Sequence, residues 1–332
     1  MSDSENKDQR VSRICKVILF TLLMACIPVG YTLYHRDYYF GGQDGNIIPA
    51  SDKKNMDQSQ KFPRLTNNGT NCFVNSLMQC LFHMDLFKLY VDTKDPDDTN
   101  SSVAVIKRIF DRMSSMPVCD FKKEYTELFK IINRHNSISS KFSIRDVGCS
   151  FELYLSLIEE FIHYELGAEK FKHYESCAKK EDLDDISNLE ISELFLIRHN
   201  FDLFRSYCNF FMAIDPPNNL DAESFLNNSI KNESIYDPLP KVLVFQNQHI
   251  EKSVPINSFI LQEFITVGDS KYKFHAYLHR TVSKDSASSH YYACVYKNDK
   301  FHILDDIRPN KVKDPVFNVK LNGIYGIFYV EV

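Results

Sequence analysis

The sequence predicts an α+β fold in which a helical half precedes a strand-rich half. Of its 332 residues, 44% are hydrophobic and 25% are charged, as in ordinary globular proteins. Between residues 72 and 166, apolar side chains recur at helical spacing. From residue 239 onward, short β-type runs replace that pattern. Helices and strands segregated in this way predict an α+β layout with a cleft between the two halves.

Composition excludes several classes of function. The net charge is −5, from 39 basic and 44 acidic residues, so no strong basic field favours a nucleic-acid partner. With only 10 glycines, a glycine-rich phosphate loop is not expected. The nine cysteines are odd in number, and no C-x-x-C pair occurs. We therefore expect reduced thiols and no structural zinc, disulfide framework or other cofactor.

The N-terminal region is expected to anchor the chain in a membrane. After a polar tail over residues 1–16, Val17–Tyr34 gives 18 positions without a charge, close to the roughly 20 residues that a transmembrane helix needs. A secretory signal peptide is the alternative, but no A-x-A cleavage site follows. Residues 35–60 show little periodicity and are interpreted as a linker.

Hydrophobic periodicity then predicts the secondary structure. Helices are expected over residues 72–90, 103–113, 122–133 and 152–166. Strands are expected over residues 241–245, 259–267, 272–278, 291–296, 301–304 and 324–330.

The segment before the first helix delivers a cysteine to a helix start. A polar turn, Asn67 to Asn71, precedes Cys72. Free N–H groups and partial positive charge at a helix N-terminus favour a thiolate. They also hold an oxyanion, with the Asn67 amide as a candidate second donor. A capping turn that buries an inert thiol is the alternative interpretation.

A predicted hairpin supplies a base and an acid. If Asn298-Asp299 is its two-residue loop, Cys294 faces Ile303 and Tyr292 faces Asp305. His290 then becomes a diagonal neighbour of Asp305, about 7–8 Å away at the backbone. Asp306 falls on the opposite face, unless a bulge reverses the choice. Two surface polar residues on a hairpin are the alternative interpretation.

Together these segments resemble the ubiquitin-specific proteases. That family's cysteine box reads G-L-x-N-x-G-N-T-C-Y-x-N-S-x-x-Q, and residues 64–79 read R-L-T-N-N-G-T-N-C-F-V-N-S-L-M-Q. The segment His290-Tyr291-Tyr292-Ala293 resembles the family's G-H-Y-x-A, residues 301–306 its W-Y-x-F-D-D and residues 324–329 its A-Y-x-L-F-Y. The resemblance covers roughly residues 61–332, in the family's order of motifs. The positions that match the cysteine box are Leu65, Asn67, Gly69, Cys72, Asn75, Ser76 and Gln79.

The resemblance implies a papain-like cysteine protease fold with a helical thumb over about residues 61–188. A β-sheet palm with strongly reduced fingers would occupy about residues 189–332. Cys72 would attack the carbonyl after the C-terminal Gly-Gly of ubiquitin, and His290 would be general base and then acid. Asp305 would orient His290, Asn67 would contribute to the oxyanion hole, and Asp306 would be an auxiliary acid. The expected partners are ubiquitin and ubiquitinated proteins.

Departures from the family pattern keep alternatives open. Thr70-Asn71 stands where Asn-Thr is usual. Ser289 replaces the glycine before the histidine, which we expect to stiffen or narrow the channel for the tail. Cys149 stands where an acid would meet the tail arginine of ubiquitin. A ubiquitin-binding pseudo-protease and a protease for another ubiquitin-like modifier are therefore the alternatives to a deubiquitinase.

Localisation is predicted from chemistry and charge together. Reduced thiols and a ubiquitin substrate place the catalytic domain in the cytosol. The positive-inside count opposes this placement, because four basic residues precede the span and Arg36 alone follows closely. A mitochondrial outer-membrane anchor need not obey that rule. We therefore expect a single-pass protein in the mitochondrial outer membrane, ahead of the endoplasmic reticulum.

Overall fold

The computed structural model describes most of the second of two compact units. The units are Met1–Met56 and Asp57–Val332. The predicted tail, transmembrane helix (residues 17–34) and linker (residues 35–60) lie outside the described residues. Among the residues that are described, no helix is long and apolar enough to cross a membrane. The described residues are 62–96, 101–135, 142–144, 148–167, 186, 188–197, 212–214, 221–231, 239–247, 259–281, 290–321 and 323–332.

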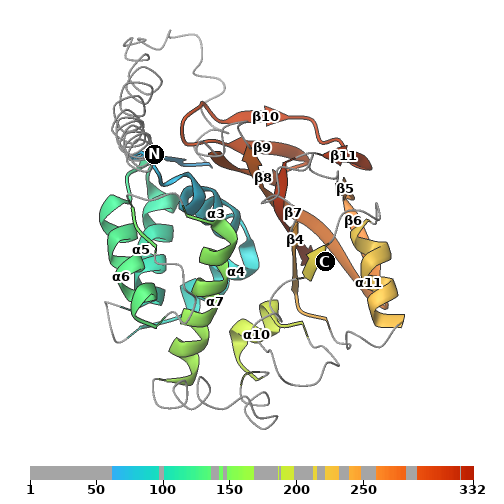
Figure 1. The fold of residues 1–332 in the computed structure, drawn as a ribbon, viewed down its shortest axis with the longest axis horizontal. Helices are drawn as coiled ribbons and strands as arrows, with labels where there is room; N and C mark the ends of the chain where they lie inside the picture. The colour runs from blue at the N-terminus through green and yellow to red at the C-terminus, as the bar shows by residue number, and fades with distance from the viewer. Residues whose placement is uncertain are drawn as a thin grey trace, which may run out of the picture. The chain divides into compact units, whose positions relative to one another are not determined.

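Helices dominate the first half of this unit, as the periodicity predicts (Figure 1). The prediction of a single helix over residues 72–90 is wrong in one respect. This segment forms two helices, with a break at His83 and Met84. Two further helices, α10 and α11, were not predicted. The helices are α3 (Cys72–Phe82), α4 (Asp85–Thr93), α5 (Ser102–Ser115), α6 (Lys122–His135), α7 (Ser150–Leu166), α10 (Glu190–Phe195) and α11 (Ala222–Lys231).

An eight-stranded sheet forms the second half. Its strands run in the order β10-β9-β8-β7-β12-β4-β3, and β6 pairs with β7 outside this path. Strands β1 and β2 form a separate parallel pair, and β5 and β11 a separate antiparallel pair. The strands are β1 (Arg64–Leu65), β2 (Val118–Cys119), β3 (Met212–Ile214), β4 (Val242–Asn247), β5 (Phe259–Leu261), β6 (Phe264–Val267), β7 (Ser270–Thr281), β8 (His290–Lys297), β9 (Lys300–Leu304), β10 (Lys311–Lys313), β11 (Val319–Leu321) and β12 (Ile324–Glu331).

The predicted hairpin is confirmed with its register. Cys294 pairs with Ile303 and Tyr296 with Phe301 across β8 and β9. Asn298 and Asp299 form the turn with φ of 53° and 56°. Two consecutive residues at positive φ are what a two-residue hairpin turn requires, and Asn and Asp tolerate this conformation.

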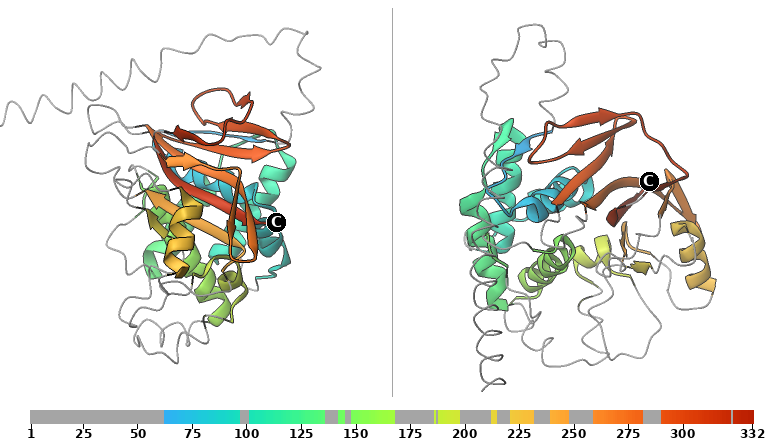
Figure 2. Two further views of the ribbon diagram at one scale, coloured as in Figure 1. Left: turned by 90° about the vertical axis from the view of Figure 1, so that its right-hand side faces the viewer. Right: turned by 45° about the horizontal axis from the view of Figure 1, so that its top comes forward.

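The two faces of the sheet belong to two cores. Alternate residues of β8 show the period of two: Ala293 and Val295 face the core shared with the helices, and Cys294 and Tyr296 face the second core. The second core also contains Leu226 of α11. Helices α3 to α7 therefore cover one face of the sheet, and α11 lies against the other (Figure 2).

Helix α3 is the central helix of the unit, because all eleven of its residues are buried. It packs against β7 and β8 of the sheet and against α4 and α7. A helix buried all round must satisfy its polar side chains internally. Gln79 donates to the carbonyl oxygen of Pro63 at 2.7 Å, and Ser76 donates to that of Phe73 at 3.1 Å. These two side chains therefore find their partners inside the protein.

Candidate active site

Cys72 is the first residue of α3, and its side chain is 6% exposed. The preceding turn is held by the Asn67 side chain, whose Oδ1 accepts hydrogen bonds from the backbone N–H groups of Gly69 (2.9 Å) and Asn71 (3.3 Å). Gly69 has φ of 113°, a conformation that side chains with a Cβ rarely adopt. The polar turn and its glycine thus place the thiol at the helix N-terminus.

His290 is the first residue of β8 and approaches Cys72 from the sheet. The Oγ1 of Thr281 accepts from the His290 N–H at 3.2 Å and donates to the His290 carbonyl at 3.1 Å. The imidazole Nε2 lies 2.9 Å from Asp305 Oδ1, and the ring also hydrogen-bonds the Cys72 side chain. Because Nε2 faces the carboxylate, Nδ1 is left for the sulfur.

The pKa of His290 is set by these two partners. Burial lowers it, but hydrogen bonds to Asp305 and Cys72 outweigh burial and raise the pKa to about 10. The pKa of Asp305 responds in the opposite sense. Burial raises it, yet the hydrogen bonds from His290 and from the Ile307 N–H leave it below its ordinary value. The geometry therefore favours a charged imidazolium beside an ionised carboxylate.

Asp306 also reaches the site, contrary to the expected face. Its Oδ1 lies 3.9 Å from His290 Nε2, against 2.9 Å for Asp305. The expectation that Asp306 points to the opposite face of the hairpin is wrong, because β9 ends at Leu304 and the alternation of strand side chains ends with it. Burial, with the neighbouring Asp305 charge, raises the pKa of Asp306.

Two amides of the cysteine segment hold Asp306. Asn67 Nδ2 donates to its Oδ1 at 3.2 Å, and Asn75 Nδ2 donates to its Oδ2 at 2.8 Å. The Asn75 side chain is in turn fixed by the Tyr125 hydroxyl, which donates to its Oδ1 at 2.9 Å. Tyr125 lies on α6, and its part in the site has no local sequence signal. An amide carries two N–H groups, so Asn67 retains one for another acceptor.

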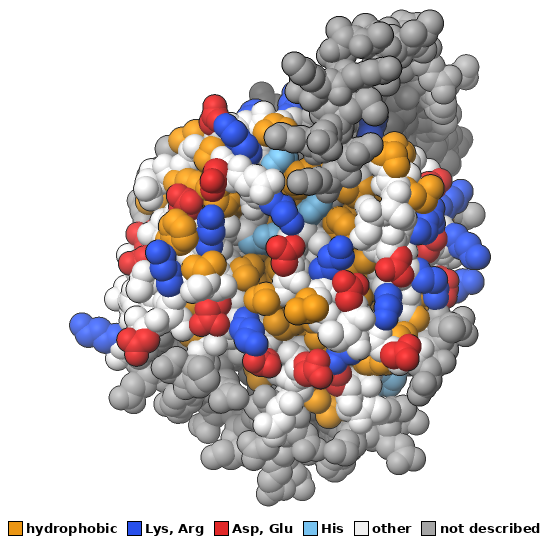
Figure 3. Space-filling view, turned by 180° about the vertical axis from the view of Figure 1, so that it is seen from behind, with side chains coloured by type: hydrophobic (Ala, Val, Ile, Leu, Met, Phe, Trp, Pro, Cys, Tyr) orange, Lys and Arg blue, Asp and Glu red, His pale blue; other side chains and the backbone are white. Residues whose placement is uncertain are grey.

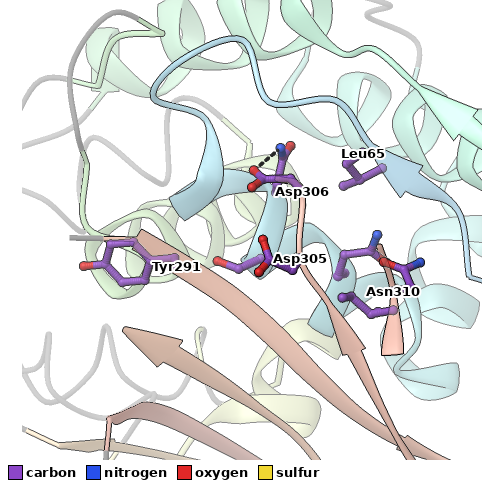
Figure 4. A pocket seen from close by; sticks show the side chains of 9 residues that line it. Leu65, Tyr291, Asp305, Asp306 and Asn310 are labelled. Carbon is purple, nitrogen blue, oxygen red and sulfur yellow. Dashed lines mark hydrogen bonds between the residues drawn. The ribbon is translucent and has the colours of Figure 1, made fainter. Parts of the chain in front are cut away.

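Of these residues, Asn75, Asp305 and Asp306 border a small pocket between the helices and the sheet (Figure 4). Tyr291, Asp305 and Asp306 lie along one side, and Leu65 and Asn310 along another. In the described part of the chain, the group of three side chains able to ligate a metal is His290, Asp305 and Asp306. The carboxylate oxygens of Asp305 and Asp306 already accept hydrogen bonds from Asn67, Asn75 and Ile307, so the three side chains fit a hydrogen-bonded network that needs no cation.

The face of the molecule in Figure 3 bears on the expectation that no strong basic field is present. Acidic and basic side chains alternate there, and no continuous basic field is visible.

Cys149 is half-buried at the start of α7, and its thiol hydrogen-bonds the Tyr325 hydroxyl at 2.7 Å.

A thiol at a helix start, an imidazole from a strand and an acid after the next strand define a cysteine-type hydrolase of papain-like architecture. The family model described as ubiquitin carboxyl-terminal hydrolase matches residues 63–329. The chain belongs to the ubiquitin carboxyl-terminal hydrolase family, and it is a cysteine-type ubiquitin hydrolase.

Solved structures share this fold at low sequence identity. A chain of the Ubp8-Sgf11-Sgf73-Sus1 SAGA DUB module is 14% identical, with TM-score 0.56 over 90% of this chain and 73% of that one. The module bound to ubiquitin aldehyde gives 14% identity and TM-score 0.54, over 90% and 74%. An essential yeast splicing factor gives 13% and 0.55, over 82% and 70%. No curated protein sequence matches. Since a splicing factor shares the fold, function must be argued from the site.

Proposed function

We propose that this protein is a deubiquitinase that hydrolyses the isopeptide bond after the C-terminal glycine of ubiquitin. The proposal is carried by one observation: segments more than 200 residues apart bring Cys72, His290 and Asp305 into one hydrogen-bonded chain. A structural role alone would not require a partly buried imidazole to face both a thiol and a carboxylate. The family membership supplies the class of substrate.

In the first step, the Cys72 sulfur attacks the carbonyl carbon and forms a C–S bond. The carbonyl electrons move to its oxygen, which then accepts from the Cys72 backbone N–H and from the second N–H of Asn67. The His290 imidazolium transfers its proton to the leaving lysine amine as the C–N bond breaks. In the second step, His290 takes a proton from water, which hydrolyses the thioester and releases the modifier. Asp305 holds the imidazole throughout.

The roles of the two acids follow from their surroundings. Asp305, ionised and in contact with Nε2, keeps the imidazole oriented and stabilises its positive charge. Asp306 accepts from Asn67 and fixes the direction of that amide, which the oxyanion role requires. We therefore assign Asp306 as a positioning residue.

An electrophile-tipped ubiquitin tests the proposal. Residues 1–332 should attach the probe, and the Cys72→Ser variant should not. Cys149→Ser is the matched control, because Cys149 is a partly exposed thiol that directly precedes helix α7, and it should still react. Two probes built on ubiquitin-like modifiers belong in the same experiment. Attachment of one of these in place of ubiquitin would identify a different modifier as substrate, and ubiquitin binding without attachment would indicate a pseudo-protease.

We also propose that the N-terminal segment anchors the protein with its catalytic domain in the cytosol, in the mitochondrial outer membrane ahead of the endoplasmic reticulum. The uncharged run over residues 17–34 and the chemistry of a thiol nucleophile support this topology. Protease treatment of intact organelles is the test. The domain after residue 35 should be digested, and protection until the membrane is opened would contradict the topology.

A further inference from the structure

The outer edge of the sheet presents apolar side chains to solvent. Strand β10 stands at the end of the strand order and pairs with β9 (Figure 1). Every residue from 307 to 314, a stretch that includes β10, is exposed. Val312 is 55% exposed, and Ile307 and Val316, on either side of the strand, are exposed as well. Large apolar side chains that gather on one exposed edge indicate an interaction surface.

Basic side chains accompany these apolar ones. Arg308, Lys311 and Lys313 are exposed in the same stretch, whose acidic residue, Asp314, forms an ion pair with Lys300. None of the described carboxylates lies within ion-pair distance of Lys311 or Lys313. The whole chain has a net charge of −5, so the positive charge of this edge is a local feature. We call Ile307, Arg308, Lys311, Val312, Lys313 and Val316 the basic edge.

A lysine on an edge strand also has a simpler role, which is to keep the strand from pairing with another chain. Pro309 and Pro315 flank β10 and serve the same purpose, since proline donates no hydrogen bond to a neighbouring strand. A strand of three residues also offers few backbone groups to an added peptide strand. This role accounts for the lysines but not for the exposed Ile307, Val312 and Val316. A ligand that accepts basic and apolar side chains together, without strand pairing, accounts for both.

The basic edge lies where the chain enters the described unit. Phe62 is the first described residue, and its ring stacks on that of His302 with centroids 3.9 Å apart. His302 is the cross-strand partner of Val312. The Phe62 carbonyl oxygen accepts a hydrogen bond from Nδ2 of Asn310, the residue before β10, at 3.3 Å. The segment that follows the uncharged run of residues 17–34 therefore joins the unit beside the basic edge.

We propose that the basic edge docks on an anionic lipid surface, that of the membrane in which the N-terminal run is anchored. The inference rests on the proposed anchor and goes beyond the proposed hydrolysis. Anionic headgroups attract lysine and arginine, and apolar side chains beside them enter the interfacial layer. Each basic residue at such a surface strengthens binding about fivefold. Because Asp305 and Asp306 directly precede Ile307, docking brings the catalytic residues close to the membrane and favours conjugates on that membrane as substrates.

A tryptophan reporter tests the docking, because the chain contains no tryptophan. Val312→Trp in the full chain is reconstituted in vesicles of phosphatidylcholine alone and of phosphatidylcholine mixed with phosphatidylserine. Its emission should shift to shorter wavelength only in the vesicles with phosphatidylserine, because the indole then moves from water into the interface. Leu89→Trp is the matched control, since Leu89 is an apolar residue of α4 that is 61% exposed. Its emission should be the same in both vesicles.

Removal of two lysines then tests the part played by charge. Lys311→Gln combined with Lys313→Gln, in the Val312→Trp chain, should lower the ratio of docked to undocked protein about 25-fold. The emission shift should then be lost. Lys271→Gln combined with Lys273→Gln is the control, because it removes the same charge from β7 and should leave the shift in place. Far-ultraviolet circular dichroism checks that each variant is folded.

Three results would overturn the inference: no shift in either type of vesicle, an equal shift in both, or a shift that survives the loss of Lys311 and Lys313. A shift caused by soluble polyglutamate, without one caused by lipid, would assign the basic edge to an acidic protein partner instead. Release of the chain from the vesicles by alkaline carbonate would contradict the anchor, and the emission shift on mixing would still report docking. Failure of the ubiquitin probe to label Cys72 would contradict the proposed hydrolysis alone.

Discussion

The histidines near the two ends of α3 have pKa values shifted in opposite directions. At its start, His290 contacts Cys72 and Asp305, and its pKa rises to about 10. At its end, His83 lies among His275 of β7 and His302 of β9, and all three pKa values are lowered, mainly by burial. We call His83, His275 and His302 the histidine cluster. The helix, the sheet and the residue type are the same at both ends.

The difference lies in the partners. The histidine cluster has carbonyl and aromatic neighbours: His275 Nε2 hydrogen-bonds the Cys80 carbonyl at 2.9 Å, and the Phe62 ring stacks on His302 with centroids 3.9 Å apart. The charge of Lys297 lowers the pKa of all three histidines further, although the Lys297 carbonyl hydrogen-bonds His302 and raises the pKa of that residue. Lys88 also lowers the pKa of His83, whereas the Asp85 carboxylate raises the pKa of His275. Burial alone favours a neutral imidazole, and a contacting carboxylate is needed to reverse it.

The sharpest test exchanges one histidine at each end for glutamine. Glutamine preserves a donor near the Nε2 position but carries no proton to transfer. His290→Gln should lower kcat/KM about 10³-fold, because the general base and acid is lost. His302→Gln should leave kcat/KM within about twofold at pH 7.5. Steady-state kinetics on the same substrate measures both. Equal losses would show that the two ends do not differ in function.

The next largest effect on catalysis is expected at Asn67, in the turn before α3. Asn67→Ala should lower kcat about 10²- to 10³-fold, since it removes a donor to developing negative charge. KM should change little, because that charge is absent from the bound substrate. Asn68→Ala is the matched control, since its amide donates to the exposed Asp120 at 2.9 Å. A change confined to KM would show that Asn67 is structural.

Of the two acids, the one nearer to His290 Nε2 should contribute more to kcat. Asp305→Asn should lower kcat about 100-fold, because the asparagine cannot stabilise the imidazolium. Asp306→Asn should cost less, since Asp306 Oδ1 is 3.9 Å from Nε2 and acts through Asn67. kcat values for the two variants decide the order. The reverse order would assign the orienting role to Asp306.

The sequence predicted the start of α3 far better than its end. The hairpin register followed from Asn298-Asp299, because only a few residue types adopt positive φ at two consecutive turn positions. That register brought His290 and Asp305 together from sequence alone. It failed at Asp306, because strand alternation cannot be extended beyond Leu304, where the strand ends. Which of two adjacent acids contacts a histidine was therefore only half predictable.

The end of α3 was missed for a different reason. His83 interrupts a continuous apolar pattern without a proline or glycine, so nothing local predicts the break between α3 and α4. His83, His275 and His302 meet only because α3 packs against β7 and β8, and β9 pairs with β8. Strands β1, β2, β3, β10 and β11 were missed because each has three residues or fewer, too short for a periodicity to register. The resemblance to a family contributed the roles of the residues, which geometry by itself does not name.

The two ends should also respond oppositely to pH. In the histidine cluster the folded pKa lies below the unfolded value of about 6.5, so stability is full above pH 6.5 and falls as the pH drops. His275, with a folded pKa of about 4, should alone cost about 2 kcal/mol at pH 5. For His290 the folded pKa is raised, so its contribution is full below pH 6.5 and is lost as the pH rises through about 10.

Urea unfolding at pH 5 and pH 7.5 measures this difference. Far-ultraviolet circular dichroism is the suitable probe, because the chain has no tryptophan. His275→Gln should reduce the loss of stability at pH 5, since the variant keeps a donor for the Cys80 carbonyl but does not titrate. His290→Gln is the control: it removes a stabilisation that grows as the pH falls from 7.5 to 6.5, so it should enlarge the loss of stability at pH 5 and not reduce it. An equal loss at pH 5 in His275→Gln and wild type would contradict the assignment.

The smallest expected effect concerns Asn71, which precedes Cys72 at the start of α3. Asn71 is 1% exposed, and both polar atoms of its side chain are buried without a hydrogen-bond partner. It also makes no capping hydrogen bond to the helix. Unsatisfied buried groups destabilise a fold, whereas a capping threonine satisfies one of the free N–H groups at the helix start. Asn71→Thr should therefore raise the free energy of unfolding by about 1 kcal/mol, measured by urea unfolding at pH 7.5.

Thr70→Ser, one residue earlier, keeps its hydroxyl for the Ile144 carbonyl and should change stability by less than about 0.5 kcal/mol. A destabilised Asn71→Thr would show that the amide holds the turn through a contact made in solution, and the start of α3 would then depend on two asparagine side chains instead of Asn67 alone.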